Sequence, residues 1–328
     1  MLSWKSLIVA TGARELFLPF PGWTRPRVVG VGAIQALMKQ GLDVRGKRVV
    51  VAGTGPLLLA VADLLRTRGA NVPIILEQAA GRQVNRFALS LLRSPSKLLN
   101  ALSLRRRLIG TEYATDSYPT SVESIDSGVR VHIRRDGRVG SIDGDLLACG
   151  FNLVPNNELP SLLGCELTTG GFARVDDKLR TTVKNVFAVG EVAGIGGADK
   201  AIIEGQIASY TAMNAAIPPR LARAHTAALT FSHRLQSAFA LRQELRDLAL
   251  PETIICRCED VPRAAVEGSI GLRDAKLQTR CGMGPCQGRV CAPIMQHLFG
   301  HELPRVRPPL FPTSVGTLMA VHGMSERS

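Results

Sequence analysis

Five of the seven cysteines lie close together near the C-terminal end of the sequence, and they carry its most distinctive chemistry. Cys256 and Cys258 are separated by a single residue, and Cys286 and Cys291 form a second close pair. Four thiolates arranged as two pairs can hold an iron–sulfur cluster or a zinc ion. We therefore predict that these four cysteines are metal ligands, with Cys281 as a neighbour or a substitute ligand.

The spacing of the cysteines favours an iron–sulfur cluster over zinc. Paired zinc ligands usually have roughly two to four residues between them, and the single residue between Cys256 and Cys258 fits that habit less well. Gly282, Gly284 and Gly288 allow backbone amides to turn towards the sulfurs, where hydrogen bonds tune a cluster's potential. A zinc site and a set of buried, unligated cysteines stay open as alternatives.

A strand–turn–helix–strand pattern runs from residue 47 to Glu77 and predicts a nucleotide-binding βαβ unit. Gly53 permits the tight turn, and Gly55 lets a pyrophosphate approach the start of the helix. Glu77 closes the second strand, where a carboxylate accepts hydrogen bonds from a ribose. Leu58 replaces the third glycine of the fingerprint, so an empty or repurposed pocket remains an alternative. The residues predicted to bind this second nucleotide, whether NAD(P), FAD or ATP, are Gly53, Gly55, Pro56 and Glu77.

Two further apolar strands flank this unit, at residues 7–11 and 185–189. They end in Thr11-Gly12 and in Gly190-Glu191, and this order resembles that of flavoproteins with two dinucleotide-binding domains. In that family both strands belong to the flavin domain, whose first βαβ unit should lie upstream of Thr11. That unit is not in this sequence, so we expect the chain alone to bind flavin poorly. The resemblance implies that FAD is contacted by Thr11, Gly12, Gly190, Glu191 and Gly194.

The cysteine-rich segment carries a narrower resemblance. Cys256-Arg-Cys-Glu-Asp-Val and Thr279-Arg-Cys-Gly-Met-Gly-Pro-Cys-Gln-Gly-Arg resemble the bacterioferritin-associated-ferredoxin-like (BFD-like) [2Fe-2S] domain. The most similar version ends the A (alpha) subunits of opine oxidases, dye-linked proline dehydrogenases and hydrogen cyanide synthase. The resemblance implies a heteromeric FAD-dependent oxidoreductase that acts on the CH–NH group of an opine or a secondary amino acid. A second flavoprotein subunit would oxidise the C–N bond, and electrons would pass through the [2Fe-2S] cluster.

We find no His/Asp/Ser constellation that indicates a catalytic site of this chain's own. His225, His233, His297 and His301 are scattered, and we interpret them as structural. Two alternative functions therefore remain open. One is a non-catalytic iron–sulfur electron-transfer or scaffold subunit that has lost its FAD, and the other is a zinc-stabilised interaction module.

The predicted fold class is α/β: an incomplete FAD domain with an inserted Rossmann-like domain, followed by a small helical BFD-like domain. The predicted boundaries are 1–32 and 147–218 for the FAD domain, 33–146 for the inserted domain, 219–249 for a helical linker, 250–303 for the BFD-like domain and 304–328 for an extended tail.

Composition excludes several other classes of protein. The 328 residues are 45% hydrophobic and 20% charged, the balance of a globular protein rather than a disordered one. The net charge of +13 suggests nucleic acid, but aromatic residues are only 5%, too few for stacking platforms, so we expect no nucleic-acid partner. No apolar stretch reaches the length of a membrane span and no signal peptide is recognisable. We expect a cytoplasmic protein.

Overall fold

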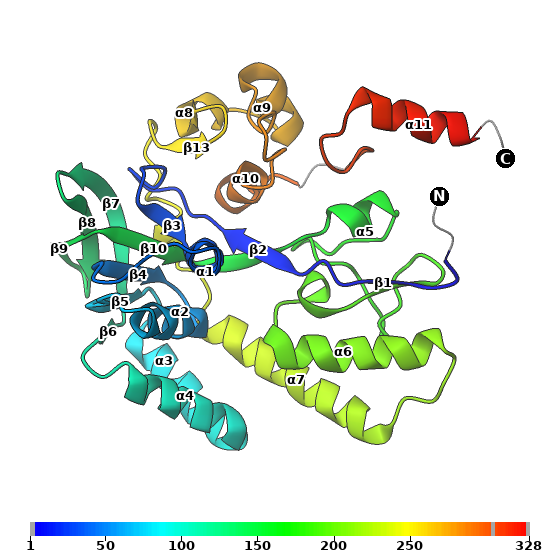
Figure 1. Ribbon diagram of the computed structural model, residues 1–328, viewed down its shortest axis with the longest axis horizontal. Helices are drawn as coiled ribbons and strands as arrows, with labels where there is room; N and C mark the ends of the chain where they lie inside the picture. Colours follow the sequence, from blue (N-terminus) through cyan, green and yellow to red (C-terminus); the bar gives the residue numbers. More distant parts are fainter. Residues whose placement is uncertain (1–3, 303–305, 326–328) are drawn as a thin grey trace. The chain divides into compact units, whose positions relative to one another are not determined.

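The computed structural model describes residues 4–302 and 306–325 of the chain (Figure 1). The first three residues of the predicted FAD domain, and residues 303–305 and 326–328 around the predicted tail, lie outside the described residues. The chain forms two compact units. The first unit comprises Met1–Ala13, Pro155–Thr226 and Leu303–Ser328, and the second comprises Arg14–Val154 and Ala227–Glu302.

The second unit is built on a five-stranded parallel sheet in the order β3-β10-β4-β5-β6. Every residue of β4 and β5 is buried, as expected for apolar runs that are covered on both faces of a parallel sheet. The predicted strand–turn–helix–strand pattern is confirmed, because β4 and β5 are parallel neighbours with α2 between them in sequence. The strands are β3 (Val28–Gly30), β4 (Val49–Gly53), β5 (Ile74–Glu77), β6 (Glu112–Ala114) and β10 (Leu146–Gly150).

Helix α2 (Pro56–Thr67) begins where the glycine turn ends. Pro56 occupies the first helical turn, where its missing N–H costs no hydrogen bond. Leu58, Val61, Ala62 and Leu65 recur at helical spacing, and all four are buried. The apolar face of α2 therefore packs into the core, and it holds the start of the helix at the turn.

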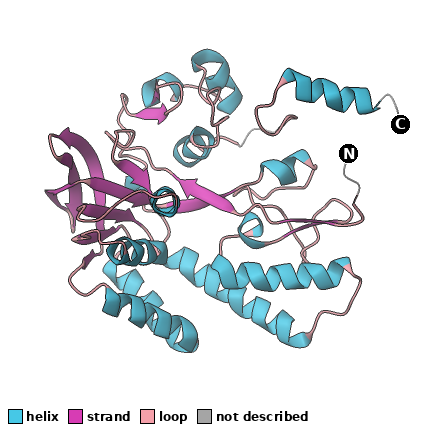
Figure 2. Cartoon of the chain, in the orientation of Figure 1, coloured by secondary structure: helices cyan, strands magenta, loops and turns pink. Residues whose placement is uncertain are grey.

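A three-stranded antiparallel sheet in the order β7-β8-β9 completes the strand-rich part of the second unit. Along β8, Val129, Val131 and Ile133 alternate with less buried residues, the pattern of a strand with one face on the core. Helices lie between the strands of the parallel sheet in the sequence (Figure 2). The bounds are β7 (Ser117–Ile125), β8 (Gly128–Arg135), β9 (Arg138–Gly144), α1 (Val31–Lys39), α3 (Gly81–Ser90), η1 (Leu91–Arg93) and α4 (Pro95–Arg107).

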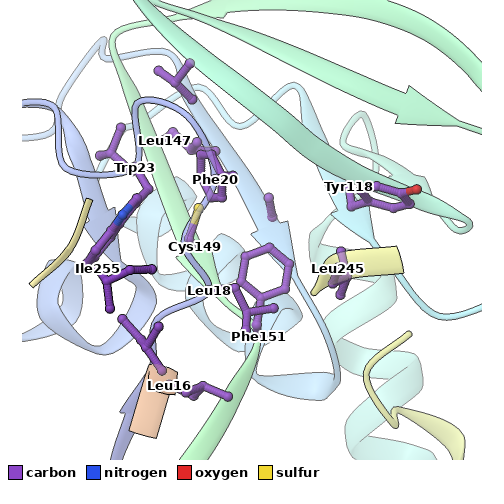
Figure 3. Close-up of a cluster of buried hydrophobic side chains, with 14 of the residues drawn as sticks. Leu16, Leu18, Phe20, Trp23, Tyr118, Leu147, Cys149, Phe151, Leu245 and Ile255 are labelled. Atoms are coloured by element: carbon purple, nitrogen blue, oxygen red, sulfur yellow. The ribbon is translucent and has the colours of Figure 1, made fainter. Parts of the chain in front are cut away.

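The cysteine-bearing segment shares a hydrophobic core with this sheet domain (Figure 3). The core joins the apolar residues that follow β2 (Ala13–Leu16) to Leu147 of β10 and to Leu245 and Ile255. In addition, the indole Nε1 of Trp23 donates a hydrogen bond of 2.7 Å to the carbonyl of Ile254. The division into units therefore differs from the predicted domain boundaries. Residues 14–32 and 250–302, expected in separate domains, fall in the same unit as the inserted domain because they contribute to one core.

The elements of the cysteine-bearing segment are short. Strands β13 and β14 pair antiparallel and place Cys256 at the end of β13. Three helices and one 3₁₀ turn account for the remaining regular structure. The bounds are η3 (Gln243–Leu245), β13 (Ile254–Cys256), β14 (Val261–Pro262), α8 (Arg263–Val266), α9 (Leu272–Thr279) and α10 (Cys291–Phe299).

In the first unit, β1 (Leu7–Val9) pairs parallel with β12 (Val186–Ala188). Helix α7 (Pro219–Ala238) begins in this unit and ends in the second. Helix α11 (Val315–Ser325) occupies part of the stretch for which an extended tail was predicted. No helix of the described residues is both long enough and apolar enough to cross a bilayer. The remaining elements of the first unit are α5 (Glu158–Leu162), η2 (Gly190–Ala193) and α6 (Gly197–Ala212). Strand β11 (Asn152–Pro155), which lies in the second unit except for Pro155, pairs with β2.

Candidate functional site

Three of the five clustered cysteines converge on one point of the second unit. The sulfurs of Cys256, Cys281 and Cys291 all lie within 4.8 Å of one another, and all three residues are buried. Cys256 ends strand β13, Cys281 follows helix α9, and Cys291 opens helix α10. A strand end, a turn and a helix start therefore bring three thiols to one place, which we call the sulfur trio.

The other two cysteines lie next to each other at the edge of the same segment. Cys258 is exposed and Cys286 is half-buried, and the Cys258 sulfur lies beside the backbone and the side chain of Cys286. Gly284 lies against Cys258 so closely that an added Cβ would come within 2.2 Å of the Cys258 Cβ. A side chain at position 284 would therefore displace the Cys258–Cys286 pair.

The structure thus distributes the four predicted ligands over two groups. Cys256 and Cys291 lie together in the sulfur trio, while Cys258 and Cys286 form the outer pair. Cys281, expected as a neighbour or a substitute ligand, is the third member of the trio. Its sulfur also lies 3.6 Å from the Met295 sulfur.

Electrostatics in the sulfur trio favours a single thiolate when no cation is present. Hydrogen bonds from the thiols of Cys281 and Cys291 lower the pKa of Cys256 to about 2. The hydrogen bond to Cys256 in turn raises the pKa of Cys281 to about 12, and that of Cys291 is raised by the same contact. Three sulfurs this close can all ionise only if a cation neutralises their charge. The three thiols are therefore a suitable donor set for a thiolate-bound metal.

Backbone amides also approach the trio. The amide of Gly282 donates to the Cys256 sulfur at 3.5 Å, and Gly282 adopts a φ of +84° that favours glycine. Amide–sulfur hydrogen bonds of this kind tune the potential of an iron–sulfur cluster. The geometry and the donor chemistry therefore fit a cluster held by thiolates.

In the first unit the two predicted flavin motifs meet at one edge of a small parallel sheet. Val9 is in register with Ala188, so Thr11-Gly12 and Gly190-Glu191 both follow the carboxyl ends of neighbouring strands. In parallel sheets, bound ligands lie at the carboxyl ends of the strands. Gly12 and Gly190 have φ values of +70° and +75°, which a glycine adopts without strain.

Two contacts hold the edge together. The Thr11 hydroxyl donates to the carbonyl of Asn156 at 2.6 Å, and the Asn156 amide donates back to the carbonyl of Thr11 at 2.9 Å. Gly194, the last of the predicted flavin-binding residues, follows η2 with a φ of +145°. Its carbonyl accepts a hydrogen bond from the buried Lys200 ammonium at 2.9 Å.

A buried ion pair that the sequence motifs did not indicate lies next to the Gly190 turn. Lys200 and Glu204 are one helical turn apart on α6, almost fully buried, and paired at 2.7 Å. The Glu204 carboxylate also accepts the Gly190 amide at 2.7 Å and faces Nε2 of His225 at 3.2 Å. Burial acts to raise the pKa of Glu204, but the hydrogen bonds from His225 and Lys200 outweigh it and leave the pKa lowered. The signal available in the sequence was the Lys–Glu spacing of four residues after the Gly190 turn.

In the inserted domain the structure brings the glycine turn and Glu77 into direct contact. Gly53, the last residue of β4, lies so close to the neighbouring strand β10 that an added Cβ would lie 2.0 Å from the carbonyl oxygen of Gly150. The Gly55 amide donates to the Glu77 carboxylate at 2.7 Å, while Pro56 opens α2. Burial raises the pKa of Glu77, although four hydrogen bonds oppose this shift.

The chain is similar to known proteins over most of its length. A family model described as pyridine nucleotide-disulphide oxidoreductase matches residues 1–227. The A subunit of opine oxidase from Rhizobium meliloti (strain 1021) is 32% identical over an alignment of 351 residues, which covers 95% of this chain and 75% of that protein. The HcnB subunit of hydrogen cyanide synthase from Pseudomonas aeruginosa is 31% identical over 321 residues, covering 88% of this chain and 69% of that protein.

A third relative matches a shorter stretch. The assimilatory nitrate reductase electron transfer subunit of Bacillus subtilis (strain 168) is 30% identical over 198 residues, covering 58% of this chain and 23% of that protein. All three relatives are named as subunits.

Proposed function

This chain belongs to the pyridine nucleotide-disulphide oxidoreductase family and to the family of opine oxidase A subunits, and from that premise we propose that it relays electrons within a heteromeric flavin-dependent oxidoreductase. The relay runs between FAD and a [2Fe-2S] cluster. The electron donor is an opine or another secondary amino acid, and a second flavoprotein subunit oxidises its C–N bond. The observation that carries the proposal is the convergence of Cys256, Cys281 and Cys291 beside the Cys258–Cys286 pair.

The cysteine arrangement supports a two-iron cluster because such a cluster takes two thiolates on each iron. The outer pair, Cys258 and Cys286, would hold one iron, and two sulfurs of the trio would hold the other. We assign the second pair to Cys256 and Cys291, with Cys281 as the substitute ligand. A bound cluster would supply a one-electron carrier and FAD a two-electron carrier, while the chain holds them and sets their potentials.

The first unit supports flavin binding through the meeting of its two motifs. Thr11, Gly12, Gly190, Glu191 and Gly194 are the residues that we propose to contact FAD. The Lys200–Glu204 pair orients the Gly190 turn from below, through the Gly190 amide and the carbonyls of Gly190 and Gly194. This leaves the outer side of the turn to a ligand.

The cluster assignment is tested by purifying the chain anaerobically and measuring its visible absorption, iron, acid-labile sulfide, zinc and released flavin. We expect iron and sulfide in equal amounts, with the visible bands of a cluster. Zinc without iron or sulfide would instead support the zinc-stabilised module. Cluster bands in a complex that holds no FAD would support the scaffold subunit.

The ligand set is tested by five single cysteine-to-serine variants. We expect Cys256→Ser, Cys258→Ser, Cys286→Ser and Cys291→Ser to lose most of the bound iron and Cys281→Ser to keep it. Cys165→Ser, a buried cysteine of the first unit, is the matched control. Iron loss in Cys281→Ser with retention in Cys291→Ser would move the fourth ligand to Cys281 and leave the cluster proposal intact.

The donor class is tested on the complex with its partner subunit. We expect substrate-dependent reduction of an artificial dye by opines or secondary amino acids, and none by primary amines or hydroxy acids. Dye reduction by hydroxy acids alone would contradict the CH–NH donor.

A further inference from the structure

The glycine turn of the inserted domain already holds a carboxyl group, that of Glu77. Its Oε1 accepts hydrogen bonds from the Thr54 hydroxyl at 2.8 Å and the Ala79 amide at 2.9 Å. Its Oε2 accepts the Gly55 amide at 2.7 Å and the Tyr113 hydroxyl at 3.3 Å. A carboxylate has about four acceptor positions, so those of Glu77 are all engaged by the protein.

This engagement removes both groups that a dinucleotide would use. In a site that binds a dinucleotide, the glycine amide of the turn faces the pyrophosphate. Here the Gly55 amide donates its hydrogen bond to Glu77 instead. The carboxylate that would accept the ribose hydroxyls has no acceptor position left. Because Glu77 is fully buried at the turn, its carboxyl group also occupies the place beside the Gly55 amide that a phosphate would need.

The mouth of the turn is covered by another part of the same unit, residues 239–242, which follow helix α7. The Gln78 side chain, itself fully buried, donates to the carbonyl of Ala240 at 3.1 Å and accepts the Arg242 amide at 3.2 Å. The same Gln78 amide donates to the Thr54 hydroxyl at 3.0 Å. One side chain thus ties the covering segment to the turn.

Phe239 contributes an apolar contact directly over the turn. Its ring lies 3.8 Å from the position of a Cβ on Gly55, and its carbonyl oxygen lies 3.4 Å from the Thr54 hydroxyl oxygen. The ring packs edge-on against Phe87 of α3 at a centroid distance of 5.2 Å. An aromatic ring and a backbone carbonyl therefore lie where the nucleotide would approach the turn.

Neighbouring contacts fix this segment on both sides. Upstream, Phe231 packs against Phe87, and the Lys97 ammonium lies 4.2 Å above the Phe231 ring. Downstream, the Arg242 guanidinium pairs with the Asp116 carboxylate. Three residues further on, Leu245 is fully buried in the core that also contains Cys256.

We propose that the Gly53–Gly55 turn is an internal docking site for residues 239–242 and takes no second nucleotide. The turn binds the stretch that leads from α7 to the cysteine-bearing segment, and so anchors that segment on the sheet. This inference goes beyond the proposed function and holds whether the cysteines bind iron, zinc or nothing.

The first test asks whether a nucleotide reaches the turn. The full chain is mixed with NADH, NADPH or ATP at about 1 mM, a level that saturates ordinary cofactor sites, and followed by hydrogen-exchange mass spectrometry. We expect unchanged exchange in the peptides that cover residues 51–58 and 239–242. Protection of 51–58, or faster exchange of 239–242 on adding any of the three, would show that the nucleotide displaces the segment and would overturn the proposal.

The second test releases the segment. Gln78→Ala removes three hydrogen bonds, and we expect amide exchange across residues 239–250 to accelerate about tenfold or more, since each bond contributes about 1 kcal/mol. The matched control is Gln278→Ala, on the exposed face of α9. Phe239→Ala is the second variant, because it leaves the buried polar network intact. Exchange that is unchanged in both variants would show that the turn does not anchor the segment.

Discussion

At the scale of single residues, the properties of a buried carboxylate depend on the hydrogen-bond partners that its oxygen atoms already have. Glu77 and Glu204 are both buried carboxylates beside a glycine turn, and each accepts the amide of a glycine, Gly55 or Gly190. They differ in their other partners. Glu204 is paired with the Lys200 ammonium, whereas the partners of Glu77 are uncharged. This explains why the pKa of Glu204 is lowered and that of Glu77 is raised by burial.

The lowered pKa of Glu204 predicts a pH-dependent contribution to stability. An acid whose pKa falls on folding stabilises the folded state above its unfolded pKa, near 4.5, and the contribution disappears as the pH falls through the folded value. We expect Glu204→Gln to be destabilised relative to the wild type at pH 7, and the difference in melting temperature to shrink below pH 4.5. A difference that stays constant down to pH 3 would contradict the ion pair. Asp177→Asn, at an exposed site of the same unit, is the control.

The close approach of Gly53 to Gly150 predicts a steric loss of stability that can be separated from the loss caused by backbone strain. Gly53→Ala combines a φ of +144° with a Cβ 2.0 Å from the Gly150 carbonyl, so we expect a loss of about 3 kcal/mol in the free energy of unfolding. Gly41→Ala has a positive φ with open space around it and should lose only about 1 kcal/mol. Denaturant unfolding measures both, and equal losses would mean that the contact with Gly150 is unimportant.

At the scale of elements, the cysteines depend on short turns rather than on long helices. Cys258 and Cys286 lie in turns, and Cys291 opens a helix of nine residues. Such turns have little stability of their own. Their positions come from the core beneath them, where Ile255, Val266 and Ile294 are fully buried.

The position of Gly284 against Cys258 predicts that one added methyl group disturbs metal binding by the outer pair. Gly284→Ala would bring a Cβ within 2.2 Å of Cys258, so we expect the purified chain to lose more than half of its iron. The control is Gly268→Ala, whose added Cβ meets nothing within 4 Å. Iron analysis and visible absorption provide the measurement, and full loading of Gly284→Ala would show that Cys258 does not bind the metal.

At the scale of the whole molecule, the chain divides into two units, and each groups residues that are distant in sequence. The first unit holds the proposed flavin edge, and the second unit holds both the glycine turn and the cysteines. The shared core of the second unit couples the cysteines to the inserted sheet.

This coupling predicts the effect of metal removal. Ligands that bind only the folded state stabilise the unit that contains their site. We therefore expect chelation of the metal to lower the melting temperature of the second unit and to accelerate hydrogen exchange in residues 254–295. Exchange in residues 186–212 of the first unit should stay the same. Equal acceleration in both units would show that the metal does not act through the second unit alone.

Features that depend on neighbouring positions could be predicted from the amino-acid sequence. The apolar run of β4, the glycine turn and the buried face of α2 follow from residue types at short spacing, and so does the grouping of the five cysteines. The motifs also indicated the family, because short motifs keep their residue types and order.

The contacts between residues that are distant in the sequence could be learned only from the folded chain. Cys281 joins the trio, Glu77 saturates the turn, and residues 239–242 cover it through contacts that span more than 160 positions. Such contacts depend on how the core packs and on where each hydrogen-bond donor finds its acceptor. A glycine turn looks the same in sequence whether its amide faces a phosphate or a neighbouring carboxylate, and the three-dimensional arrangement of the chain distinguishes the two.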